Sequence, residues 1–88
     1  MANKRSIKNG IHVICESVFA ECIAVALYGP EKHAKAAEDC ANAVIKLEDH
    51  YLRRVSHPEP GMKPKAYYKD LRVQFTKEVN DLLDHLSS

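Results

Sequence analysis

The stretch YYKDLRVQFTKEVNDLLDHL, residues 67–86, decides the fold class of this 88-residue chain. Its apolar residues follow one another at steps of three and four, which is the spacing of one face of an α-helix. The residues of this seam are Tyr68, Leu71, Phe75, Val79, Leu82 and Leu86. Pro64 suits the first turn of a helix, so the pattern predicts a helix over residues 64–86.

The N-terminal segment has the same periodicity and predicts a helix over about residues 4–28. Its start is open, because Gly10 costs about 1 kcal/mol inside a helix and Ser6 or Asn9 could cap a later start. Its end is clearer, since Gly29 is suited to the left-handed conformation that ends many helices.

The middle segment predicts a helix over residues 31–55, directly after Pro30. Its apolar stripe consists of Ala37, Cys40, Ala41, Val44, Leu47, Tyr51 and Val55. No segment alternates with the period of two that a half-buried strand requires. We therefore predict one all-α domain over residues 1–88, an up-down-up three-helix bundle.

The composition is that of an ordinary soluble protein, with 45% apolar residues, 28% charged residues and a net charge of +1. The odd cysteine count and the lack of a CxxC pair indicate buried free thiols at Cys15, Cys22 and Cys40.

No signal peptide is visible. The apolar run over residues 11–28 is interrupted by polar residues and is shorter than the ~20 residues of a membrane span. We expect a cytoplasmic protein that does not contact a membrane.

The sequence offers no constellation that is typical of an enzyme or a metal centre. His12 and Glu16 could supply two metal ligands at i, i+4, but nothing repeats the pattern. Cys15 and Cys22 share an apolar helix face, where a thiol is unreactive, and no glycine-rich phosphate loop is present. We expect no catalytic residue, no metal and no cofactor.

The first predicted helix carries more apolar surface than two neighbours need, over an arc of about 220°. Ile23 and Leu27 lie at the edge of this arc. One interpretation is that the loop or long side chains cover them. The other is that they form a second buried face, and so the interface of a homodimer. Glu21 is expected to face solvent, and under a partner it would need a cation to offset its desolvation.

Cations are segregated along the chain. In an up-down-up bundle the start of the first helix, the end of the second and the start of the third lie at one pole. We call this the basic pole, and it gathers Lys4, Arg5, Lys8, Arg53, Arg54, Lys63, Lys65, Lys69 and Arg72, nine of the chain's thirteen Lys and Arg. The opposite pole holds Glu21, Glu31, Glu38, Asp39, Glu78, Asp81 and Asp84.

Two interpretations of the basic pole stay open, a solvated surface and a site for an anion or a nucleic acid. Tyr67 lies among the cations and could stack on a base. Tyr68 begins the core seam, so only Tyr67 is expected to be free for this purpose.

The loop between the second and third helices is stiffened by its sequence. Glu59-Pro60-Gly61-Met62 fits a type II turn, with Pro and Gly at its central positions. Met62 and Val55 are expected to pin the loop over the open end of the core.

The segments RRVSHPEPGMKPKAYYKDL (residues 53–71) and FAECIAVALYG (residues 19–29), roughly a third of the chain, resemble a family of small uncharacterised bacterial proteins. The resemblance implies a compact helical bundle and no assigned function.

The leading functional hypothesis is a non-enzymatic protein-interaction or assembly domain. The alternative is anion or nucleic-acid binding through the basic pole.

Overall fold

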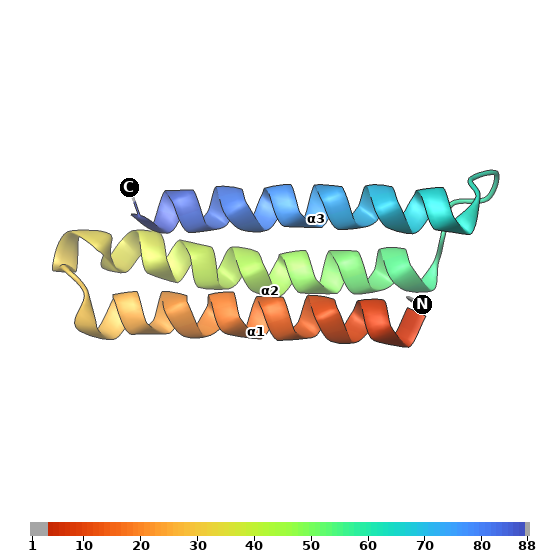
Figure 1. The fold of residues 1–88 in the computed structure, drawn as a ribbon. Helices are drawn as coiled ribbons and strands as arrows, with labels where there is room; N and C mark the ends of the chain where they lie inside the picture. The colour runs from red at the N-terminus through yellow and green to blue at the C-terminus, as the bar shows by residue number, and fades with distance from the viewer. Residues whose placement is uncertain (1–3, 88) are drawn as a thin grey trace.

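The structure, a computed structural model, describes residues 4–87. In these residues the chain forms three long helices and no strand. In order along the chain these elements are α1 (Lys4–Tyr28), the 3-10 turn η1 (Glu31–His33), α2 (Ala34–Ser56) and α3 (Pro64–Ser87). Successive helices run in opposite directions (Figure 1). The predicted all-α, up-down-up three-helix bundle is confirmed.

The α-helix α1 begins at Lys4, the earlier of the starts that the sequence left open, so neither Ser6 nor Asn9 caps it and Gly10 lies inside it. The structure differs from the predicted helix ends in two other places. Residues 31–33 form a 3-10 turn ahead of α2 instead of its first α-helical turn. Among the described glycines only Gly61 has a positive φ, of 96°, so Gly29 does not end α1 in the left-handed conformation.

Gly29 has a different physical role. A Cβ atom at this position would lie 2.7 Å from the carbonyl oxygen of Val25. The backbone N–H of Gly29 donates to that same oxygen at 3.0 Å. A glycine is therefore needed here for close backbone approach and not for a left-handed conformation.

The core follows the predicted stripes. From α2 it takes Ala37, Cys40, Ala41, Val44, Tyr51 and Val55, with Leu47 half-buried. The prediction that Tyr67 is free was wrong, because Tyr67 is 4% exposed and its hydroxyl donates to the Arg54 carbonyl at 2.8 Å. Tyr68 is half-buried beside it. Tyr67 is therefore not free to stack on a ligand.

The loop after α2 adopts the expected turn in part. The Met62 N–H lies 3.4 Å from the Glu59 carbonyl oxygen, and Gly61 supplies the positive φ that a type II turn requires. Val55 is fully buried, but Met62 is 39% exposed. Only Val55 therefore acts as an anchor in the core.

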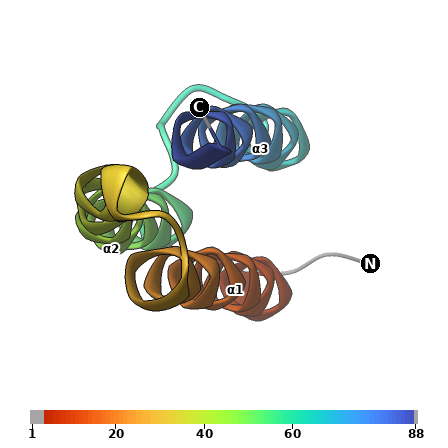
Figure 2. The ribbon, with the colours of Figure 1, turned by 90° about the vertical axis from the view of Figure 1, so that its left-hand side faces the viewer.

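The bundle is open on one side. The middle helix α2 packs against both neighbours, whereas α1 and α3 hardly touch. Figure 2 shows α2 between α1 and α3, with α1 and α3 lying on separate sides of it. The molecule measures 47 × 19 × 18 Å, and its radius of gyration is 14.5 Å. A compact domain of this length has about 12 Å, so the chain is extended for its size.

Candidate interaction groove

The fold brings the cations of the basic pole together, because the starts of α1 and α3 and the end of α2 lie at one end of the molecule (Figure 1). Two of the nine are held by neighbours in the same chain. Arg53 pairs with Asp49 at 3.2 Å. Arg54 donates to Gln74 at 2.8 Å, and its guanidinium lies over the rings of Tyr51 and Tyr67.

The other seven cations form no ion pair with any described side chain; they are Lys4, Arg5, Lys8, Lys63, Lys65, Lys69 and Arg72. Lys65, Lys69 and Arg72 follow at steps of four and three along α3, so they lie on one face of that helix. This face borders the open side of the bundle, since Arg72 lines a hollow there.

That hollow lies between α1 and α3 near their starts, and we call it the near hollow. It has a volume of about 310 Å³. Its lining consists of Ser6, Ile7, Gly10, Ile11 and Ile14 from α1 and Leu71, Arg72, Phe75 and Thr76 from α3. Its floor is apolar, because Ile11 and Phe75 belong to the core.

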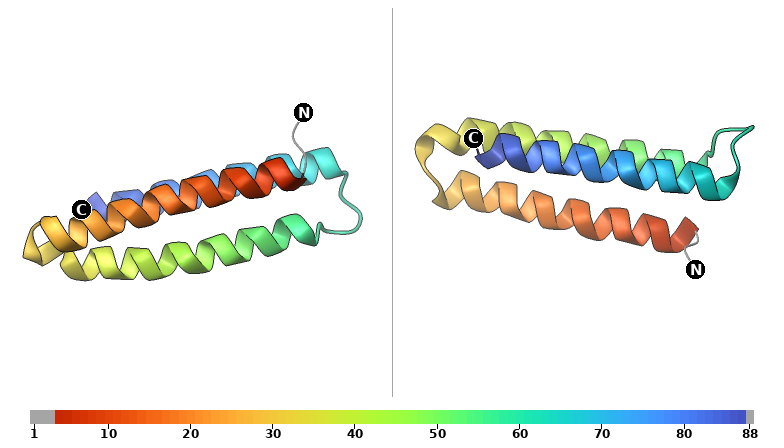
Figure 3. Two further views of the ribbon diagram at one scale, coloured as in Figure 1. Left: turned by 90° about the horizontal axis from the view of Figure 1, so that it is seen from below. Right: turned by 45° about the horizontal axis from the view of Figure 1, so that its top comes forward.

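A second hollow of about 410 Å³ follows between the same two helices, further from the basic pole. We call it the far hollow, and its lining consists of Ser17, Val18, Glu21, Val25, Leu83 and Leu86. Together the two hollows form what we call the α1–α3 groove. Figure 3 shows that α1 and α3, which bound this groove, run in the same direction.

The groove contains charge of both signs. Arg72 is the one charged residue among those lining the near hollow, and Glu21 is the one in the far hollow. Glu21 was expected to face solvent, and the structure leaves it exposed at the edge of this apolar surface.

Ile23 and Leu27, the predicted interface residues, lie elsewhere on α1. They are 40% and 68% exposed, and neither lines the groove. The loop and the long side chains of this chain therefore do not cover them. Whether they form an interface stays a prediction.

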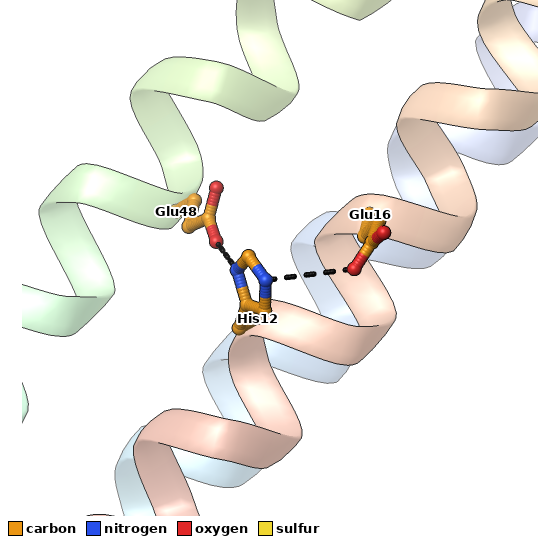
Figure 4. A network of polar contacts seen from close by, with 3 residues as sticks. All are labelled: His12, Glu16 and Glu48. Carbon is orange, nitrogen blue, oxygen red and sulfur yellow. Dashed lines mark hydrogen bonds and ion pairs between the residues drawn. The ribbon is translucent and has the colours of Figure 1, made fainter.

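His12 is exposed, and its ring has partners on two helices. Figure 4 shows its ring between two carboxylates. Nδ1 lies 2.7 Å from Glu48 Oε1 on α2, and Nε2 lies 3.5 Å from Glu16 Oε2 on α1. The hydrogen bond with Glu48, together with the charge of that carboxylate, raises the pKa of His12. The two nitrogens face different carboxylates, and no three potential ligands in residues 4–87 converge on a metal position.

The three cysteines are free and buried. Burial raises the pKa of Cys15 to about 11 and also raises the pKa values of Cys22 and Cys40. Thiols with raised pKa values are poor nucleophiles at neutral pH. This geometry gives the cysteines a packing role.

Helix α1 is long and apolar enough to cross a membrane by length and composition alone. The core helix of a soluble protein and an N-terminal signal sequence meet the same criterion. The expected cytoplasmic location therefore stays a prediction.

The groove was missed at the level of sequence. Gly10, Ser17 and Glu21 follow at steps of seven and four, so they share one side of α1 at the edge of its apolar arc. This pattern could have indicated a helix-packing surface. The residues that face it from α3 could not be assigned, because periodicity does not fix how two helices are rotated against each other.

Comparisons with protein-family models, with curated proteins and with solved structures find no match for this chain. The resemblance to small bacterial helical proteins stays a prediction.

Proposed function

We propose that this chain is a non-enzymatic assembly domain, and that a helix from another polypeptide fills its α1–α3 groove. The observation that carries the proposal is the sparse contact between α1 and α3, which leaves an apolar groove between them. A helix that lies in this groove would contact both α1 and α3, as the fourth helix of a four-helix bundle contacts two neighbours.

The exposed area of the chain supports this proposal. Its accessible surface is 6311 Å², whereas a compact monomer of its mass exposes roughly 5,200 Å². An elongated shape contributes to the difference, so the difference is an upper limit on what a partner covers. It exceeds the ~800 Å² that each partner loses in a standard interface.

Site-specific photo-crosslinking tests the proposal. A photoreactive phenylalanine derivative replaces Ile14, which lines the groove, or its neighbour Val13, which does not. Both side chains are exposed, at 43% and 62%. We expect adducts with an identified helical segment from position 14 and none from position 13. Equal adducts at both positions, or none at position 14, would contradict a docking role for the groove.

Ile23 and Leu27 are a second candidate interface, since the structure leaves both exposed. A crosslinker at position 23 tests them in the same experiment. Adducts at position 23 but not at position 14 would assign the assembly role to the outer side of α1 instead of the groove.

Anion or nucleic-acid binding is the second candidate function. It is favoured by the unpaired cations that the fold gathers at the basic pole, whereas the burial of Tyr67 removes the expected stacking surface. Fluorescence anisotropy with labelled oligonucleotides at low and high salt tests it. Salt-sensitive binding would support this function, and no binding at low ionic strength would remove it.

A further inference from the structure

We propose that the partner in the α1–α3 groove is a second copy of this chain, lying antiparallel, so that Arg72 of each copy faces Glu21 of the other. This inference rests on the proposed function, because it names the occupant of the same groove. In this arrangement the basic pole of each copy lies beside the acidic, opposite pole of the other.

The first argument is the charge in the groove. Each hollow has a single charged lining residue, and the two have opposite signs. A surface that carries one cation and one anion at separate positions is complementary to itself when one copy is reversed. Two such copies form two ion pairs related by a two-fold axis, which is the symmetry of most homodimers.

The second argument is the position of the two charges along the groove. Arg72 lies opposite the part of α1 that is centred on Gly10, and Glu21 lies eleven residues further along α1. At 1.5 Å per residue this separation is roughly 16 Å. A two-fold axis that crosses the groove midway between them exchanges the near and far hollows. Both charges then meet their opposites in one arrangement.

The third argument is the charge of the whole molecule. The basic pole carries nine of the thirteen Lys and Arg, while seven of the twelve Asp and Glu lie at the opposite pole. An antiparallel copy brings each basic pole beside an acidic one. A parallel copy would place Arg72 beside Arg72 and cations beside cations, which disfavours that orientation.

The fourth argument is Gly10. It lies inside α1, where glycine costs about 1 kcal/mol relative to alanine. A Cβ atom at this position would meet nothing within 4 Å in the single chain. The fold of one chain therefore does not require glycine here. A second backbone passing close to the near hollow would require it.

Charge reversal tests the arrangement. The variants are Glu21→Arg, Arg72→Glu and the double variant, with Glu38→Arg as a control for the charge change. All three residues are exposed in the single chain, so the substitutions leave the fold intact, and circular dichroism checks this. Sedimentation equilibrium at low ionic strength gives the dimer dissociation constant of each protein.

We expect wild-type protein to dimerise, and the dimer to weaken as salt screens its charges. Each single reversal places like charges opposite each other twice, so it weakens the dimer at least about tenfold. The double variant restores the pairs with their signs exchanged, and its dissociation constant returns to within about threefold of wild type. Glu38→Arg makes the same charge change at the opposite pole without altering a residue that lines the groove, so it weakens the dimer less than either single reversal.

Two outcomes overturn the inference. A clean monomer mass at high protein concentration excludes the second copy, and the proposed function survives only if position 14 still crosslinks to another protein. A dimer that the single reversals do not weaken, or that the double variant does not restore, excludes the antiparallel register. In that case crosslinks at position 14 between two copies would show that the groove still binds a second chain in another orientation.

Discussion

The two sides of the bundle are built differently. Where α2 meets α3, aromatic side chains and hydrogen bonds occupy the interface, and the Tyr51 hydroxyl donates to the Glu78 carboxylate. The ring of Tyr51 packs edge-on against Phe75 at 5.2 Å. Burial and the bond to Glu78 raise the pKa of Tyr51 to about 12. Where α1 faces α3, the lining combines small and aliphatic residues and the edge of the core at Phe75 with two separated charges.

The α2–α3 interface is complete within one chain, whereas the α1–α3 groove leaves surface that a partner could cover. The polar groups at the α2–α3 interface have partners within the chain, so this side needs no second molecule. The α1–α3 groove leaves an apolar floor and two unpaired charges at its rim. We infer that changes at the first side act on folding, and that changes at the second act on association.

The largest expected effect is on the stability of the α2–α3 interface. Tyr51→Ala removes an aromatic residue that is 2% exposed, and we expect the free energy of unfolding to fall by about 3–5 kcal/mol. Urea unfolding of dilute protein measures this. Tyr28→Ala is the matched control, because Tyr28 is 86% exposed and a surface change costs within about 0.5 kcal/mol. Similar losses for both variants would contradict a role of the α2–α3 interface in folding.

The next effect is on the groove. Ile14→Asp places a charge on the apolar wall of the near hollow, so we expect dimerisation to weaken about tenfold or more, equivalent to roughly 1.4 kcal/mol. The unfolding of dilute protein should change no more than for Val13→Asp, which carries the same substitution outside the groove. If the two variants dimerise equally well, the interface lies elsewhere.

A smaller effect of opposite sign is expected at Gly10. Gly10→Ala should stabilise the single chain by about 0.5–1 kcal/mol, because alanine favours a helix and its Cβ atom has free space. The same methyl group should weaken the dimer. Thermal unfolding and sedimentation measure the two effects separately. Gly61→Ala is the contrasting variant, and it should destabilise the chain because its φ is 96°.

The smallest effect concerns pH and the contact between α1 and α2. The folded pKa of His12 is raised by Glu48, so its stabilising contribution is complete below the unfolded pKa of about 6.5. The contribution is lost as the pH rises through the raised folded pKa. Wild type should therefore lose more stability than His12→Ala between about pH 6 and pH 8. An equal loss in both proteins would show that the contact with Glu48 is not maintained in solution.

The helices could be predicted from sequence because their cause is local. Leu71, Phe75 and Val79 follow at four-residue steps, and this spacing determines a helix face without knowledge of any partner. The choice between Tyr67 and Tyr68 could not be made in this way. It depends on the Arg54 and Val55 carbonyls, which accept from these two hydroxyls across the interface.

The candidate site was harder to predict because it depends on relations between helices. His12 and Glu48 are 36 residues apart, and no spacing rule joins them. Arg72 was assigned to the basic pole, but its place in a groove with Gly10 depends on how α1 and α3 are oriented around α2. The sequence shows that α1 has more apolar surface than a core face needs. It does not show which of these residues face the core, line the groove or lie on the exposed outer side.

The parallel course of α1 and α3 has an electrical consequence. Two helices point one way and one points the other, so one helix macrodipole remains uncompensated, with its positive end at the starts of α1 and α3. The cations of the basic pole add to it in the same sense. A single chain therefore has a permanent dipole moment along its 47 Å axis and orients in an electric field. In an antiparallel pair the two moments cancel, so transient electric birefringence would distinguish one copy from two without any label.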